Sequence, residues 1–270
     1  MFDFSGKNVF VVGGTSGINF GIAQGFARWG AKMYVASRKQ DKVDAAVAGL
    51  KELGAEASGT AFDVRNYEDV EAGMQAAVDY FGGPIDILVS GAAGNFPSRV
   101  TDMSPNGVKS VVDIDLLGTF HVMRASHPHL TKPGACVINI SAPQAFLPMS
   151  YQAHVCAAKA GVDMVTKSLA LEWAEDKIRI NSISPGPIDK TEGMERLAPT
   201  PEIKDAVTKS VPLGRMGEVE DIANAAGLLA SDAGSYINGV VLPVDGGWYL
   251  GGASALMGKM SRFMDGMRKT

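Results

Sequence analysis

The chain has 270 residues, of which 46% are hydrophobic and 20% are charged, so it can bury a sizeable core. Its net charge of −4 argues against a nucleic-acid partner and against attraction to an anionic membrane surface. No hydrophobic run approaches the ~20 residues that a membrane-spanning helix needs.

Apolar, β-branched segments alternate with longer segments of helical periodicity. In chain order, this pattern predicts a strand at 7–12, a helix at 17–29, a strand at 32–36, a helix at 42–53, a strand at 57–62, a helix at 70–81, a strand at 85–90, a helix at 108–125, a strand at 136–140, a helix at 153–174, a strand at 179–183, a helix at 219–229 and a strand at 240–244. Such alternation is typical of βαβ units in a parallel sheet with helices on both faces. Since no linker divides the chain, we predict an α/β protein with one domain over residues 1–250, a doubly wound parallel sheet of the Rossmann type.

Two segments fall outside this alternation. Residues 186–217 contain several prolines and glycines with one short helical stretch, and we expect them to form a mobile substrate lid. Residues 251–270 form a C-terminal tail, for which a docked helix, a frayed end and contact with an acyl chain all stay open. The tail places apolar residues at helical spacing, namely Leu256, Met260, Phe263, Met264 and Met267.

The first predicted strand leads directly into a glycine cluster, Gly13-Gly14-Thr15-Ser16-Gly17-Ile18-Asn19, where a helix begins. Glycines let the backbone turn sharply and approach a pyrophosphate, and the N-terminus of a helix favours its negative charge. The second strand ends in Ser37-Arg38, where NAD-specific proteins usually place an acidic residue on the ribose hydroxyls. Arg38 offers a guanidinium to a 2′-phosphate instead, so we predict NADP(H), with a merely solvated arginine as the alternative.

Further short motifs follow the later predicted strands. They are Ser90-Gly91-Ala92-Ala93-Gly94, Pro185-Gly186-Pro187-Ile188 with Thr191, and Val244-Asp245-Gly246-Gly247. Together with the Gly-x-x-x-Gly-Ile spacing of the first cluster, they resemble the short-chain dehydrogenase/reductase family over nearly the whole chain. The family's last glycine in the first cluster is replaced by Asn19. The resemblance implies a set of cofactor-binding residues: Gly13, Thr15, Ser16, Gly17, Ile18, Ser37, Arg38, Asp63, Val64, Ala92, Lys159, Pro185, Gly186, Ile188 and Thr191.

The family's usual catalytic triad is absent from this chain. Members generally reduce a carbonyl with a Ser, a Tyr and a Lys, and the Tyr precedes the Lys by four residues on one helix face. Lys159 stands at the expected place, but Val155 and Ala142 occupy the Tyr and Ser positions, and Asp115 replaces the family's helical Asn.

Two other residues are candidate substitutes for the missing triad residues. Tyr151 lies eight residues before Lys159, ~12 Å along a helix. Ser141 should point away from the face that Ala142 occupies, because neighbouring strand residues alternate. A carbonyl reductase built on Tyr151 or Ser141 is therefore only an alternative.

At the positions where the chain departs from the usual family pattern, its sequence resembles one subgroup of the family, the 2,4-dienoyl-CoA reductases. The segments that carry this resemblance are Ala92-Ala93-Gly94-Asn95-Phe96, Ser104-Pro105-Asn106, Asp113-Ile114-Asp115, His154 five residues before Lys159, and Thr191-Glu192-Gly193. The resemblance is closest to the peroxisomal form, which lacks the Tyr and works with an Asp and a Lys. The mitochondrial form uses a Tyr fifteen residues before the Lys, where this chain has Gln144.

The resemblance implies reduction of a 2,4-dienoyl-CoA to a 3-enoyl-CoA with NADPH. Hydride would reach C5, negative charge would spread to the thioester oxygen, and a proton would go to C2, so no acid is needed at a carbonyl oxygen. Asp115 would hold and polarise the water that gives this proton, and Lys159 would bind the nicotinamide ribose. Candidate substrate contacts are Asn95, Phe96, Gln144, Phe146 and His154.

Several further expectations and alternatives stand beside this hypothesis. The remaining histidines have no metal-ligand neighbours in sequence, so no metal is expected. The two cysteines fit free thiols, and the N-terminus lacks the features of a signal peptide, so we expect a cytoplasmic setting. The family resemblance implies a homotetramer. The alternatives are another NADPH-dependent carbonyl or 3-oxoacyl reductase, and a non-catalytic NADP(H)-binding protein.

Overall fold

The computed structural model describes residues 2–198 and 200–251, which form a seven-stranded sheet in the order β3-β2-β1-β4-β5-β6-β7. All neighbouring strands are parallel. Their bounds are β1 (Asn8–Val12), β2 (Lys32–Ser37), β3 (Ala57–Ala61), β4 (Ile87–Ser90), β5 (Cys136–Ile140), β6 (Arg179–Pro185) and β7 (Val241–Val244). The predicted fold class is confirmed: a Rossmann-like single domain.

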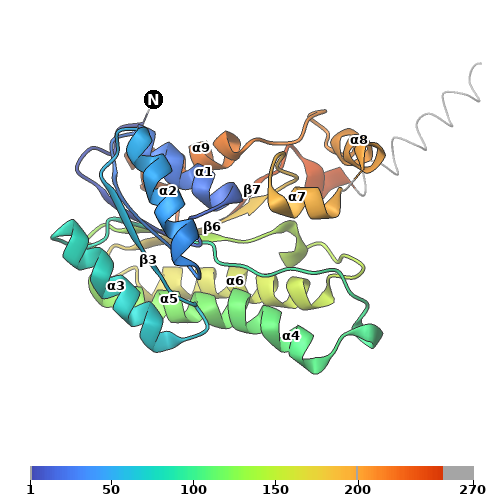
Figure 1. Ribbon diagram of the computed structural model, residues 1–270, viewed down its shortest axis with the longest axis horizontal. Coiled ribbons are helices and arrows are strands. Elements are labelled where there is room, and N and C mark those ends of the chain that lie inside the picture. The colour runs from blue at the N-terminus through green and yellow to red at the C-terminus, as the bar shows by residue number, and fades with distance from the viewer. Residues whose placement is uncertain (1, 199, 252–270) are drawn as a thin grey trace, which may run out of the picture.

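Helices cover both faces of the sheet (Figure 1). One layer holds α1 (Gly17–Arg28), α2 (Gln40–Glu52) and α9 (Val219–Ala230), and α1 packs along α9. The other layer holds α3 (Tyr67–Phe81), α4 (Pro105–Val111), α5 (Gly118–Ser126) and α6 (Ala153–Glu172). Helix α7 (Glu192–Leu197) and helix α8 (Pro201–Ser210) lie beyond the end of the sheet, above the level of α4 (Figure 1).

Strand alternation divides the core into two clusters. Along β1, Val9 and Val11 pack into the cluster under α1 and α9, and Phe10 and Val12 pack into the cluster under α3, α5 and α6. Because both faces are covered, β1 is apolar at four successive positions, as parallel strands usually are. The loops at the carboxyl ends of the strands are thus held on a rigid support.

The prediction of one regular helix at 108–125 is wrong in one respect, because the observed helix contains a turn that is wider than an α-helical turn. Helix α4 continues into a π-helical segment, η2 (Val112–Leu117), and then into α5. Short π-helical segments inside α-helices are frequently found at functional sites. Here the wider turn carries Asp115, whose side chain is buried.

The region at 186–217 is also more helical than expected, because it holds both α7 and α8 rather than one short stretch. Thr191 and Thr200 cap the two helices, since each side-chain oxygen accepts an N–H from the first turn. The apolar residues predicted at helical spacing in the tail lie outside the described residues. Within the described ranges, no helix is long and apolar enough to cross a bilayer.

Candidate active site

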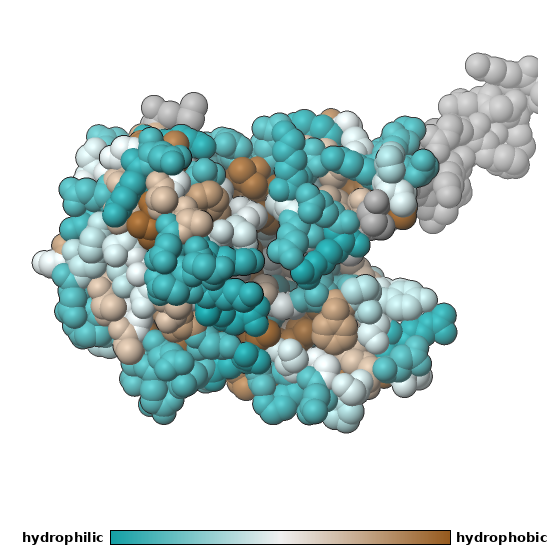
Figure 2. All heavy atoms as spheres, viewed as in Figure 1, coloured by the Kyte–Doolittle hydropathy of each residue, from teal (hydrophilic) through white to brown (hydrophobic). Residues whose placement is uncertain are grey.

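A cleft of about 620 Å³ opens at the carboxyl ends of β1, β2 and β4. Strands β1 and β4 are neighbours in the sheet, but the chain continues from β1 toward one edge of the sheet and from β4 toward the other. Ligands of open α/β sheets bind in the crevice between two such strands. Residues from α7 also line the cleft, namely Glu192 and Arg196. Figure 2 shows the hollow between the α7 region and the α4 region.

The glycine cluster forms the floor of the cleft. Gly13 has φ +79°, and a Cβ there would lie 2.8 Å from the backbone nitrogen of Ala92, so only glycine fits on both counts. The N–H groups of Gly13 and Gly14 both donate to the carbonyl of Ala36, at 2.8 and 3.2 Å, which fixes the turn. Helix α1 then starts at Gly17 with its first N–H groups facing this turn. The arrangement fits a pyrophosphate.

Asn19 replaces the family's last glycine and has a clear structural role. Its Nδ2 donates to the carbonyl of Gly91 at 2.7 Å and to that of Gly13 at 3.3 Å. A Cβ at Gly91 would collide with the Asn19 amide, so the two residues fit each other. Asn19 therefore links the glycine turn to the loop after β4, a role that the sequence pattern alone does not predict.

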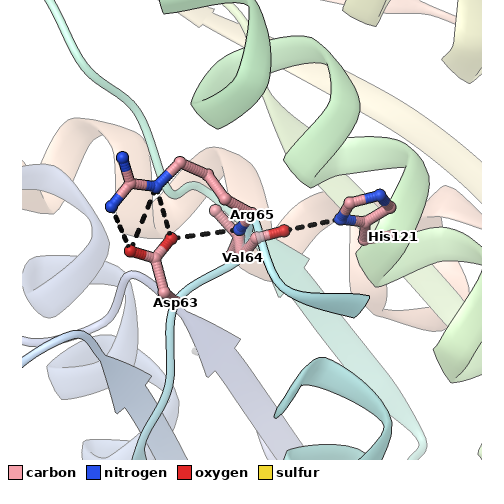
Figure 3. Close-up of polar contacts among 4 residues, drawn as sticks. All are labelled: Asp63, Val64, Arg65 and His121. Atoms are coloured by element: carbon pink, nitrogen blue, oxygen red, sulfur yellow. Dashed lines mark hydrogen bonds and ion pairs between the residues drawn. The ribbon is translucent and has the colours of Figure 1, made fainter. Parts of the chain in front are cut away.

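At the other end of the cleft, Arg38 and Asp63 line the same wall. The Asp63 carboxylate accepts hydrogen bonds from the backbone N–H and the Nε of Arg65, at 3.0 and 2.9 Å (Figure 3). These bonds to Arg65, followed by the charge of Arg38, hold the pKa of Asp63 below its usual value. In the described part of the chain, Arg38 itself forms no ion pair. Arg38 is thus available to an anion, whereas Asp63 is already engaged.

The neighbouring Val64 is fixed by a different helix. Its carbonyl oxygen forms a 2.8 Å hydrogen bond with Nδ1 of His121 from α5 (Figure 3). Gly118 allows this approach, because a Cβ there would lie 2.7 Å from a methyl group of Val64. Arg65 was not predicted as part of the site. The sequence offers one signal for it, namely its position two residues after Asp63.

Asp115 and Lys159 meet as a buried ion pair. Lys159 Nζ lies 3.5 Å from Asp115 Oδ2 and donates to the carbonyl oxygen of Ile140 at 2.9 Å. Asp115 Oδ1 accepts the N–H of Gly94 at 2.7 Å. The Asp115 and Lys159 residues are 1% and 6% exposed, respectively. The structure therefore brings the two predicted catalytic residues together at the end of β5.

Close helix packing makes this pairing possible. A Cβ at Gly161 would lie 2.8 Å from a methyl group of Leu116, so glycine at this position favours the close approach of α6 and η2. The Thr119 hydroxyl donates to the carbonyl of Asp115 at 2.6 Å. The backbone of Asp115 is fixed as firmly as its side chain.

The Ser and Tyr positions of the usual triad, Ala142 and Val155, have no proton to donate. Val155 is buried and apolar, and Ser141 lies beside Asp163 of α6. Tyr151 is 48% exposed, and its hydroxyl accepts hydrogen bonds from Nε and Nη2 of Arg99 at 3.3 and 3.2 Å. The alternative of a carbonyl reductase built on Tyr151 or Ser141 gains no support from this geometry.

The predicted substrate contacts form two groups. Asn95 and Phe96 line the cleft. The ring centroids of Phe96 and His154 are 4.7 Å apart. Neither ring nitrogen of His154 has a partner among the described residues, although both are buried. The ring of Phe146 packs edge-on against that of Tyr249, with the centroids 5.6 Å apart. Gln144 lies two residues before Phe146, in the short helix η4 (Pro143–Ala145). Helix η4 packs against α6, the helix that carries His154.

The remaining cofactor candidates lie at the end of β6. A Cβ at Gly186 would lie 2.6 Å from Cα of Asp245, so glycine allows β6 to pass close to the loop after β7. The Thr191 hydroxyl donates to the carbonyl of Ile188 at 2.9 Å. Pro185 is the last residue of β6, which is two residues longer than predicted. No group of three metal-ligating side chains occurs within residues 2–198 and 200–251.

Comparisons with known proteins agree with the fold and the motifs. A protein-family model described as "Enoyl-(Acyl carrier protein) reductase" matches residues 12–249. The chain is 43% identical over 255 residues to a peroxisomal 2,4-dienoyl-CoA reductase of Arabidopsis thaliana named as (3E)-enoyl-CoA-producing, covering 91% of this chain and 85% of that protein. It is 36% identical over 247 residues to a probable 2,4-dienoyl-CoA reductase of Bacillus subtilis named as (2E)-enoyl-CoA-producing, covering 90% and 97%. The crystal structure of a putative short-chain alcohol dehydrogenase from Sinorhizobium meliloti matches with a TM-score of 0.86 and 30% identity, covering 92% and 98%.

The expectation of a cytoplasmic setting is contradicted by these relatives. Several of them, including the Arabidopsis thaliana protein, are named as peroxisomal enzymes. The expectation rested on the absence of a signal peptide and on free cysteines, and neither feature distinguishes one reducing compartment from another.

Proposed function

This chain belongs to the short-chain dehydrogenase/reductase family, and we propose that it is an NADPH-dependent reductase of 2,4-dienoyl-CoA thioesters that yields 3-enoyl-CoA. One observation carries the proposal: a buried Asp115–Lys159 pair lies directly behind Gly94, which lines the cofactor cleft, and an apolar Val155 takes the place of the usual acid. The relatives from Arabidopsis thaliana and Bacillus subtilis are both named as 2,4-dienoyl-CoA reductases, which supports the substrate class. Of these two, the Arabidopsis thaliana protein is the one named as producing a 3-enoyl-CoA.

The two residues have distinct tasks in the proposed mechanism. When bound, NADPH supplies a hydride to C5 of the dienoyl chain. Lys159 holds the nicotinamide ribose and, through its charge, orders the water beside Asp115. Asp115 Oδ1 is already occupied by the N–H of Gly94, so Oδ2 is the oxygen that accepts a hydrogen bond from this water. The water gives its proton to C2, and the burial of both side chains strengthens their electrostatic effect.

We further propose that residues 186–217 act as the substrate lid. Glu192 and Arg196 on α7 pair with each other and line the cleft. The base of the segment is closed by two hydrogen bonds, from the N–H of Asp189 to the carbonyl of Gly217 at 2.8 Å and from the N–H of Gly217 to the carbonyl of Pro187 at 2.9 Å. The helices between these points can thus move as a unit on a fixed base.

We also propose a homotetramer. Helix α5 with the end of η2, and helix α6, expose apolar side chains of the kind that subunit contacts bury. These residues are Leu117, Phe120, Met164 and Leu171, and Leu171 is 81% exposed. Light scattering that gives the mass of four chains supports this assembly, and the mass of one chain rules it out.

The direct test is the oxidation of NADPH with 2,4-hexadienoyl-CoA, beside acetoacetyl-CoA and NADH as controls. We expect NADPH to be consumed with the dienoyl thioester and not with acetoacetyl-CoA. Activity on acetoacetyl-CoA alone contradicts the proposal and restores the carbonyl-reductase alternative. Tight NADPH binding without turnover of any thioester identifies a non-catalytic binding protein instead.

Arg38 sets the preference for NADPH in this proposal. Arg38→Ala is expected to weaken NADPH binding by about 10- to 100-fold, the equivalent of one charge-assisted hydrogen-bonded contact, and to leave NADH binding unchanged. Fluorescence titration with each cofactor measures both effects. Lys51→Ala, a substitution of an exposed lysine outside the cleft, is the control. An equal loss for both cofactors would show that Arg38 does not recognise the 2′-phosphate.

A further inference from the structure

A layer of polar side chains lies between helix α6 and the carboxyl halves of β5 and β6, directly behind Lys159. In a parallel sheet covered on both faces, this position is normally apolar. Asn139 and Ser141 continue the face of β5 that begins with Val137, and Ser182 and Ser184 continue the face of β6 that begins with Ile180. The helix contributes two polar side chains of its own. The layer is Asn139, Ser141, Asp163, Thr166, Ser182 and Ser184, all at most 7% exposed.

The hydrogen bonds of this layer are incomplete. Asn139 Nδ2 donates to Thr166 Oγ1 at 2.9 Å, and the hydroxyls of Thr166 and Ser182 are 2.8 Å apart. Four other buried atoms have no partner among the described residues: Asn139 Oδ1, Ser141 Oγ, Asp163 Oδ1 and Ser184 Oγ. Buried polar atoms without a protein partner are usually satisfied by internal water. Such a layer can therefore hold internal water behind Lys159.

Asp163 is the titratable group in the layer. It lies four residues after Lys159, so both side chains are on the same face of α6. Burial raises the pKa of Asp163 above its usual value. The Ser141 and Ser182 hydroxyls and the charges of Lys167 and Lys159 act in the opposite direction, but burial dominates. Ser141 lies beside this carboxyl, outside hydrogen-bonding geometry.

We propose that Asp163, with the Ser141 hydroxyl beside it, is an internal proton store that acts through Lys159; the inference rests on the proposed function. The reaction adds one hydride and one proton to the substrate, and the water beside Asp115 becomes hydroxide when it protonates carbon. The Lys159 ammonium donates a proton to this hydroxide, which regenerates water and leaves a neutral amine. The Asp163 carboxylic acid then donates its proton to that amine through internal water, which bridges the gap to the Ser141 hydroxyl. Solvent finally reprotonates the Asp163 carboxylate, so that charge and protons balance over one turnover.

The store itself can be tested without any substrate. The infrared absorption of a protonated carboxylic acid is expected in the wild-type protein at a pH above 3.8, the usual pKa of an aspartate, and is lost in Asp163→Asn. Stability gives a second measurement. When folding raises the pKa of a carboxyl, the protein becomes less stable as pH rises from the unfolded pKa through the folded pKa of that group. An asparagine does not titrate, so it makes no such contribution. The Tm of Asp163→Asn should therefore rise relative to wild type as pH increases above 3.8, the usual pKa of an aspartate.

Asp86→Asn is the matched control for both measurements. Asp86 is a part-buried carboxylate near the amino ends of the strands, and it accepts hydrogen bonds from the Asn8 N–H and the Thr131 hydroxyl, both at 2.9 Å. This variant should keep the infrared band and should gain no stability with pH. A wild-type protein without the band, or a Tm difference for Asp163→Asn that does not grow with pH, overturns the store.

The turnover measurement tests the relay. Asp163→Asn is expected to lower kcat by about tenfold or more, while KM for 2,4-hexadienoyl-CoA and Kd for NADPH change by less than about twofold. Wild-type kcat should fall as pH rises through the pKa of Asp163, and the variant should lack this step. An unchanged kcat or an unchanged pH profile overturns the relay. If wild type itself does not reduce the dienoyl thioester, the proposed function and the relay fail together, and the infrared band alone decides whether Asp163 stores a proton.

Discussion

Replacing Asp115 by asparagine is expected to lower kcat by at least ~100-fold, the scale of a lost acid–base contribution, while NADPH binds nearly as before. The asparagine carbonyl can still accept the N–H of Gly94, so the loop after β4 keeps its anchor. What disappears is the negative charge that polarises the water. Single-turnover oxidation of NADPH by 2,4-hexadienoyl-CoA measures the chemical step, and fluorescence titration measures cofactor binding.

A neighbouring aspartate provides the control for this substitution. Asp113 lies on the same π-helical segment, but its carboxylate pairs with Lys109 near the surface and is less buried. Asp113→Asn should change kcat by less than about twofold. If Asp115→Asn retains full turnover, Asp115 has no part in proton delivery and the mechanism is wrong.

Replacing Lys159 by methionine is expected to damage three properties at once. Turnover should fall by at least ~100-fold, and NADPH should bind less tightly, because the ammonium that holds the ribose and orders the water is gone. The protein should also lose about 3–5 kcal/mol of unfolding free energy, because a buried carboxylate at Asp115 is left without its cation. Urea unfolding, cofactor titration and steady-state kinetics separate the three effects.

The double variant Lys159→Met with Asp115→Asn tests the cause of that instability. Removing both charges removes the unpaired carboxylate, so the double variant should recover most of the lost stability. It should remain inactive, because neither group is restored. Equal instability of the single and double variants would show that Lys159 supports the fold through its contact with the Ile140 carbonyl rather than through the ion pair.

The sheet and its helices could be predicted from the sequence because local signals are strong there. β-Branched runs such as Asn8–Val12 and the glycine turn with Gly13 at positive φ are local features. The wider turn at Val112–Leu117 could not be predicted, because its apolar spacing is that of an ordinary helix. It carries Asp115, which pairs with Lys159 of a helix that lies far along the chain.

The site could be predicted only in part for a similar reason. Family motifs pointed to Asp115 and Lys159, but the burial of Asp163 depends on two strands that fold against α6. The engagement of Asp63 by Arg65 depends on side-chain conformation, which sequence spacing does not specify. The cytoplasmic expectation was wrong because composition carries no signal that separates reducing compartments.

Product analysis in D₂O tests the central claim most directly. Wild-type protein, NADPH and 2,4-hexadienoyl-CoA are combined, and the thioester product is examined by NMR. The account predicts a double bond between C3 and C4 with one solvent deuterium at C2. A double bond between C2 and C3 with deuterium at C4, or no reduction of the dienoyl thioester, contradicts it.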